Sequence, residues 1–197
     1  MAENEERLVK LDLPADREIL RAFHRMYDKE YGFEREKEDE KAFLDYLEKH
    51  QDIYHCLVFL REGKPLGYAR GYDRLSTSSC DTVFMLDIIY VSPGHRGQGV
   101  GKKMIGALVD YARDLGAARI DLLADVGNDV AQNLYKRFGF KGRTRYQLHR
   151  FLKDQPDLRR YFEEKVAQEA ALEQRTPESN VPVTREFRTD VEEEEEP

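Results

Sequence analysis

The spacing of apolar residues in the first half of the chain predicts a strand, two helices and a hairpin. Residues 8–13 read as a short strand, and apolar positions then recur at helical spacing from about Pro14 to Gly32 and again up to about His50. Residues 53–60 and 65–72 are rich in branched and aromatic side chains and flank a turn at 61–64, which predicts a hairpin. Two helices are therefore expected before the main part of the sheet.

The second half of the chain contains its most apolar run. Residues 73–80 are polar and serine-rich, which predicts a loop, whereas 82–91 are almost continuously apolar, as is typical of a central strand covered on both faces. From Gly99 the apolar positions recur at helical spacing as far as Gly116, and residues 119–124 then predict another strand. A strand, a helix and a strand in this order form a right-handed crossover, so the two runs are expected to be parallel neighbours.

Two more helices are predicted toward the C-terminus. One is capped by Asn128 or Asp129 and ends at Gly139, and the other begins at 155–157 and continues to about Gln174. Residues 140–152 read as extended, and the tail, which ends in five glutamates, is expected to be mostly disordered. We therefore expect an α/β domain over residues 1–153, a C-terminal helix over 154–175 and an acidic tail over 176–197.

Charge and composition exclude several classes of function. Residues 176–197 carry eight acidic and two basic side chains, which account for most of the net charge of -7. The remainder is nearly neutral and lacks the basic face of a general nucleic-acid-binding protein. No apolar run is long enough to span a bilayer and residues 1–7 do not resemble a signal peptide, so we expect a cytoplasmic protein with no membrane partner. The two cysteines and five histidines show no metal-ligand spacing, so we expect no metal, and we expect Cys56 to be a buried, inert thiol.

The segment from Arg96 to Gly101 predicts an anion site. A strand that leads through glycines into a helix presents free backbone N–H groups and the positive helix end to a phosphate. Residues 91–105 also carry three basic side chains and no acidic one. The segment is not a Walker A loop, because Arg96 stands in place of the first glycine and Lys103 in place of serine or threonine. A dinucleotide fingerprint read from Gly97 fails at Lys102.

This segment resembles the pyrophosphate loop of the GNAT acetyltransferase superfamily, Q/R-x-x-G-x-G/A, at Arg96, Gly99 and Gly101. Residues 86–93 resemble that family's fourth strand with its proline turn. The family's second motif is matched at its usual distance downstream by Asn128-x-x-Ala131-x-x-Leu134-Tyr135-x-x-Phe138-Gly139-Phe140. The resemblance covers about residues 8–152, the first half only in its order of elements. It implies a mixed, mostly antiparallel central sheet with two splayed parallel strands and flanking helices.

The resemblance implies that acetyl-coenzyme A is the co-substrate. Its pantetheine arm would bond to the backbone of Ile89, Tyr90 and Val91 in the gap between the splayed strands. Asn128 would bond the coenzyme arm or cap its helix, and one residue can do both. The pyrophosphate would lie on the turn and the start of the next helix, formed by Arg96, Gly97, Gln98, Gly99, Val100, Gly101 and Lys102.

The resemblance also implies acetyl transfer to a primary amine by direct attack in a ternary complex, with two catalytic side chains. Tyr135 matches the family's general acid, because a phenol of pKa about 10 can protonate a thiolate whose conjugate acid has a pKa near 8.5. The alternative is a tyrosine packed on the inner face of its helix. Asp87 interrupts the apolar strand where many members carry glutamate, and it is a candidate base, a substrate anchor or a structural aspartate. A backbone N–H near Ile89 would donate a hydrogen bond to the oxyanion.

The acceptor amine stays open. Residues 27–41 carry seven acidic and four basic side chains, with Tyr27, Tyr31 and Phe33 between them. Such a segment suits a small cationic amine, an amino sugar, or a lysine or N-terminal amine, and it is equally typical of a solvated helix face. A non-catalytic acyl-coenzyme A sensor or structural module of the same fold is the alternative function, and the last helix and tail could also serve as a scaffold.

The region after the second motif departs from the family. Residues 142–152 offer one long run without an obvious turn where the family has two strands. The last strand is therefore missing, supplied by residues 181–187, or exchanged between subunits. A homodimer is an expectation on that ground.

Overall fold

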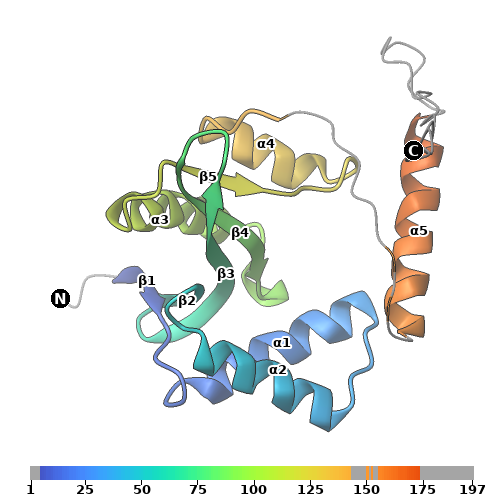
Figure 1. Ribbon diagram of the computed structural model, residues 1–197, viewed down its shortest axis with the longest axis horizontal. Helices are drawn as coiled ribbons and strands as arrows, with labels where there is room; N and C mark the ends of the chain where they lie inside the picture. Colours follow the sequence, from blue (N-terminus) through green and yellow to red (C-terminus); the bar gives the residue numbers. More distant parts are fainter. Residues whose placement is uncertain (1–4, 143–149, 151, 153–154, 174–197) are drawn as a thin grey trace, which may run out of the picture.

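The structure is a computed structural model that describes residues 5–142, 150, 152 and 155–173. Within these residues one five-stranded sheet runs through the molecule, and its strand order follows the chain, β1-β2-β3-β4-β5 (Figure 1). Neighbouring strands are antiparallel except for β4 and β5, which are parallel. The strands are β1 (Glu6–Lys10), β2 (Tyr54–Arg61), β3 (Lys64–Ser76), β4 (Asp81–Val91) and β5 (Arg119–Leu122), and the helices are α1 (Arg17–Tyr31), α2 (Lys37–Lys49), η1 (Pro93–His95), α3 (Val100–Asp114), α4 (Asp129–Arg137) and α5 (Pro156–Glu173).

Helices cover both faces of the sheet, and each face has its own apolar core. Helices α3 and α4 lie on one face and α1 and α2 on the other (Figure 1). The first core joins α3 and α4 to the sheet and includes Phe84, Met104 and Tyr135. The second joins α1 and α2 to the sheet and includes Leu20 and Leu44. The predicted fold class, a mixed and mostly antiparallel sheet flanked by helices, is confirmed.

Strand β4 is irregular at the position where its pairing with β5 ends. On its β3 side, Gly71 pairs with Leu86 and Arg70 pairs with Ile88, so Asp87 is the extra residue of a β-bulge. On its β5 side, the last pair is Leu86 with Leu122. Residues 87–91 of β4 therefore continue past the end of the parallel ladder, as expected for splayed strands.

The predicted elements are largely present, but several boundaries were wrong, and β5 ends at Leu122 and not at 124. The first strand ends at Lys10 and not at 13, and β3 extends to Ser76 through half of the predicted loop at 73–80. The polar end of β3 is held by side chains that the apolar pattern does not register. Arg74 bonds to Asp121 at 2.8 Å, and Arg119 donates to the buried Ser76 hydroxyl at 3.0 Å. The predictions for residues 143–149, 151, 153–154 and 174–197, including the tail and the last strand, lie outside the described residues.

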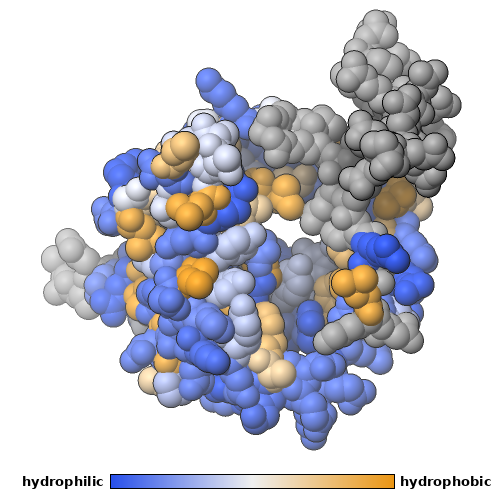
Figure 2. All heavy atoms as spheres, viewed as in Figure 1, coloured by the Kyte–Doolittle hydropathy of each residue, from blue (hydrophilic) through white to orange (hydrophobic). Residues whose placement is uncertain are grey.

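The face shown in Figure 2 is predominantly hydrophilic, and its apolar side chains form small separate groups. Cys56 is buried, as predicted, whereas Cys80 is exposed. Within the described part of the chain, no helix combines the length and the apolar character needed to cross a membrane.

His24 makes the stability of the protein sensitive to acid. It is buried on α1 against the rings of Phe43 and Tyr68, and burial, together with the charge of Arg70, lowers its pKa from 6.5 to about 3. The unfolded chain therefore binds a proton that the folded one excludes, so this stability is complete above pH 6.5 and is lost as the pH falls. We expect the free energy of unfolding to fall by about 2 kcal/mol more between pH 7 and pH 5 in the wild type than in a His24→Phe variant. Urea denaturation at both pH values measures the difference, and parallel losses in the two proteins would contradict it.

Candidate active site

The predicted phosphate turn has the geometry of an anion site. Gly97 and Gly99 have positive φ angles of 74° and 79°, which a residue with a side chain adopts only under strain. Gly99 is the N-cap of α3, and the first bond of the helix runs from the Lys103 N–H to the Gly99 carbonyl at 3.1 Å. The backbone N–H groups of residues 100–102 thus have no hydrogen-bond partner within α3, and they lie at the positive end of this 15-residue helix. They could hold a phosphate without any side chain.

Two of the three basic side chains at this turn are occupied by ion pairs. The Arg96 guanidinium binds the Glu30 carboxylate at 2.6 and 2.9 Å, and its Nε donates to the Val91 carbonyl at 2.9 Å. Lys103 pairs with Glu6. Among the described residues, Lys102 is the member of the trio that has no ion-pair partner. Arg96 therefore fixes the turn against the end of α1, and the backbone and Lys102 are the groups left to meet an anion if one binds.

The predicted coenzyme-binding stretch of β4 is open along one edge. Ile89, Tyr90 and Val91 pair with β3, but no pairing with β5 reaches them within the described residues. An open strand edge can take an extended amide chain as an additional strand. The Tyr90 ring is buried and its hydroxyl donates to Glu30 at 2.9 Å. The Ser92 N–H bonds to the Leu66 carbonyl at 3.0 Å, so the antiparallel alternation directs the backbone groups of Tyr90 toward β3 and those of Ile89 and Val91 toward the open edge.

The two motifs, distant in sequence, meet at the end of β4. A methyl group built at Gly101 would lie 3.6 Å from Leu134 of α4 and 3.8 Å from Val91 of β4. Asn128 caps α4 by accepting the Ala131 N–H at 3.1 Å, as predicted for one of its two roles. The glycine turn, the end of β4 and the second motif thus adjoin one another.

Tyr135 lies on α4, in the apolar core between this helix, α3 and the sheet. Its ring is buried, with 9% exposed, and packs 5.8 Å from the ring of Phe140. Burial raises the pKa of the Tyr135 phenol. Within the described part of the chain, its hydroxyl has no hydrogen-bond partner. The ring is packed as a core residue would be, while the hydroxyl remains free to donate a proton.

The bulge at Asp87 turns its carboxylate toward Arg70 on β3. Arg70 donates to Asp87 Oδ2 from Nε at 3.0 Å and from Nη2 as well. The guanidinium lies 5.1 Å from the Phe43 ring, and 12% of the Arg70 side chain is exposed against 42% of Asp87. The aspartate is therefore partnered on one oxygen, while Oδ1 has no partner among the described residues.

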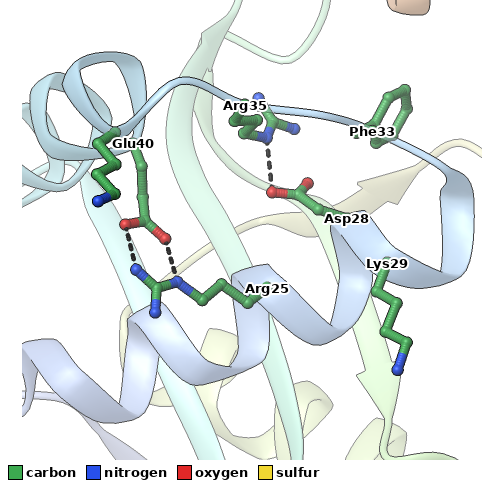
Figure 3. Close-up of a pocket in the computed structure, with 7 residues that line it drawn as sticks. Arg25, Asp28, Lys29, Phe33, Arg35 and Glu40 are labelled. Atoms are coloured by element: carbon green, nitrogen blue, oxygen red, sulfur yellow. Dashed lines mark hydrogen bonds and ion pairs between the residues drawn. The ribbon is translucent and has the colours of Figure 1, made fainter.

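Two acidic residues of the segment 27–41 are paired with arginines beside a pocket. Arg35 binds Asp28 at 2.7 Å, and Arg25 binds Glu40 through two bonds of 2.8 and 2.9 Å (Figure 3). These residues border a pocket of about 260 Å³. The predicted attraction of this segment for a cation does not follow from Asp28 or Glu40, because each already has a cationic partner.

The aromatic residues of the same segment gather as a cluster that α5 completes. The rings of Tyr27 and Tyr31 lie 4.4 Å apart, and Phe33 lies 6.4 Å from each. Tyr161 of α5 packs on Phe33 at 5.1 Å and on Tyr31 at 6.1 Å. Burial raises the pKa of Tyr27, so its phenol stays neutral.

Sequence reasoning missed Arg70, Glu30 and Tyr161. Arg70 lies in an apolar strand whose register decides its partner, and Glu30 and Arg96 are 66 positions apart in the chain. Tyr161 lies on α5, outside both motifs. No local spacing in the sequence points to these contacts. Among the described residues, no group of three His, Cys, Asp or Glu side chains is arranged to hold a metal ion.

The comparisons with known proteins agree on one family. A model of the acetyltransferase (GNAT) family matches residues 20–140. The chain is 35% identical over 100 residues to a thialysine N-epsilon-acetyltransferase of Bos taurus, covering 47% of this chain but only 58% of the bovine protein. The thialysine N-epsilon-acetyltransferase of Sus scrofa is 31% identical over 134 residues, covering 64% of this chain and 78% of the porcine one.

A solved structure has the same fold. An aminoglycoside acetyltransferase from an uncultured soil metagenomic sample is similar with a TM-score of 0.64 at 19% identity, covering 78% of this chain and 100% of that chain. At this level of identity the likeness concerns the fold alone.

Proposed function

The chain belongs to the GNAT acetyltransferase family, and on that premise we propose that it is an N-acetyltransferase that moves the acetyl group of acetyl-coenzyme A to a primary amine in a ternary complex. The observation that carries the proposal is the open edge of β4, which ends in a glycine turn at the start of α3 with Tyr135 alongside. This arrangement would provide a backbone track for an amide chain, an anion site at its end and a proton donor.

The donor would be held mainly by backbone groups. The edge of β4 at Ile89 and Val91, which has no β5 partner within the described residues, would suit the amides of a pantetheine arm, with the Val91 carbonyl already bonded to Arg96. The amides at 97–102, with the charge of Lys102, suit a pyrophosphate. When bound, acetyl-coenzyme A supplies an activated thioester carbonyl.

The chemistry requires the movement of two protons. The neutral amine nitrogen forms a bond to the thioester carbon, the carbon–sulfur bond breaks, and the sulfur accepts a proton from the Tyr135 hydroxyl. The nitrogen, which is positively charged once it is bonded to the carbon, loses a proton to water or to Asp87 Oδ1, and the Tyr135 oxygen regains a proton from water. The raised pKa of Tyr135 keeps the phenol protonated at neutral pH, as an acid must be before the sulfur departs.

Release of free thiol with a panel of primary amines tests the proposal. We expect turnover with at least one amine, and thiol release that depends on both substrates. Tight binding of acetyl-coenzyme A without turnover on any amine would contradict the proposal and favour a sensor.

Asp87 is proposed to act on the amine, either as its anchor or as the acceptor of its proton. Oδ2 is bound by Arg70, so Oδ1 is the atom available for this role. We expect Asp87→Asn to lower kcat/KM for the amine about 10- to 100-fold, because the variant keeps the shape but loses the charge. A loss carried by KM indicates an anchor and a loss carried by kcat a base. Steady-state kinetics with the same kcat/KM as the wild type would remove Asp87 from both roles.

A further inference from the structure

A pocket of about 510 Å³ lies between α5, the end of α1 and the loop that connects β5 to α4. Tyr31 lines it from α1, and Asp125, Gly127 and Asn128 line it from the loop. The remaining lining residues belong to α5, and they include Lys165 and Glu169. The pocket thus adjoins the second motif, although α5 lies beyond the residues 20–140 that match the family model.

Helix α5 contacts the end of α1 on one side of the open end of the sheet and the loop between β5 and α4 on the other. On one side, Tyr161 packs on Tyr31 and Phe33 at the end of α1. On the other, Lys165 binds Asp125, and Leu172 lies so close to Gly127 that a methyl group there would be 2.9 Å from its Cδ1. Figure 1 shows α5 standing beside this open end, across from both α1 and the loop before α4.

The chain places an alkyl ammonium of its own in this pocket. The Lys165 Nζ donates to Asp125 Oδ2 at 2.6 Å and lies 5.5 Å from the centre of the Tyr161 ring. A carboxylate and an aromatic face are the two groups that recognise an alkyl ammonium. The bond to Asp125 raises the pKa of Lys165, so the nitrogen is protonated and is a poor nucleophile.

We propose that this pocket is the subsite for a second, distal ammonium group of the acceptor, and that Lys165 occupies it as an internal competitor. The inference rests on the proposed amine acetyltransfer and names its acceptor class as an alkyl diamine. Once Lys165 is displaced, Asp125 and Glu169 both face the pocket with no internal cation between them. The attacking amine would then lie inside the cleft, and the distal ammonium would lie under α5.

The geometry leads to an unusual expectation, which is that removal of a lysine improves acceptor binding. We expect Lys165→Met to tighten the binding of pentane-1,5-diamine about fivefold, because a partly exposed ion pair competes with the ligand only to that extent. The matched control is Lys64→Met, which removes an exposed lysine at the start of β3 and should leave binding unchanged. In a Lys165→Met/Asp125→Asn double variant the gain should be lost.

The measurement is calorimetric titration of pentane-1,5-diamine into each protein saturated with coenzyme A, beside thiol-release kinetics with the same diamine. Unchanged or weaker binding in Lys165→Met overturns the inference even if acetyl transfer proceeds. Tighter binding in Lys165→Met that Asp125→Asn cancels supports the ammonium subsite. The absence of thiol release from every variant would overturn the proposed acetyl transfer and not the subsite.

Discussion

Tyr135→Phe is expected to reduce kcat for acetyl transfer about a hundred- to a thousandfold, with little change in the Kd of acetyl-coenzyme A. The substitution removes one oxygen atom whose hydrogen has no partner in the described part of the chain, while the ring keeps its packing in the first core. The departing sulfur would then take its proton from water. Thiol release under saturating concentrations of both substrates gives kcat, and a titration gives the Kd.

The matched control for this variant is Tyr111→Phe. Tyr111 lies on α3, and its hydroxyl bonds to His55 Nδ1 at 2.7 Å. Burial raises its pKa to about 12, so it is a half-buried phenol that, like Tyr135, stays protonated. We expect Tyr111→Phe to lose about 1 kcal/mol of unfolding free energy and to keep its kcat. A wild-type kcat in Tyr135→Phe would remove the proposed acid, and an equal loss in both variants would attribute the effect to packing.

Gly99→Ala is expected to weaken the binding of acetyl-coenzyme A about 10- to 100-fold. Gly99 has a φ of 79° and caps α3, so a side chain there forces the turn to change its backbone angles and the direction of the N–H groups that follow. The same strain should cost about 1 kcal/mol of unfolding free energy. Calorimetry with acetyl-coenzyme A and urea denaturation measure the two effects separately.

The other end of the same helix offers a control of equal strain. Gly116 has a φ of 77°, and like Gly99 it has no atom within 4 Å of the place where a methyl group would lie. Gly116→Ala should therefore lose a similar amount of stability and keep the wild-type Kd. If both variants bind the coenzyme equally well, the turn is not the pyrophosphate site.

The parts of the site that the sequence predicted are those built from local backbone. The glycine turn, the start of α3 and the cap of α4 depend on residues within a few positions of each other, and their spacing is visible in the chain. The pairing of Asp87 with Arg70 depends instead on sheet register and on a bulge, which move a side chain without changing the apolar pattern. The apolar pattern did not predict the extension of β3 to Ser76 for a similar reason, because polar residues are allowed in a strand when a neighbouring strand supplies their hydrogen-bond partners.

A count of charges does not show which charges of the acidic segment are available to a ligand. Three of its seven acidic residues are paired with arginines, Asp28 with Arg35, Glu40 with Arg25 and Glu30 with Arg96. The Arg96 guanidinium lowers the pKa of the Glu30 carboxyl, which marks a contact that holds the turn in place. Only the folded arrangement shows which charges remain for a ligand.

The agreement between strand order and chain order has a consequence for the way in which the protein forms. Strands β1 to β4 can join one after another as an antiparallel meander, and each new strand meets the edge left by the one before. Strand β5 alone must wait for α3 to cross over, because a parallel partner cannot be reached by a tight turn. Since the gap between β4 and β5 is made by this last addition, the coenzyme cleft would be completed late during synthesis, when a preformed four-stranded sheet already carries one of its walls.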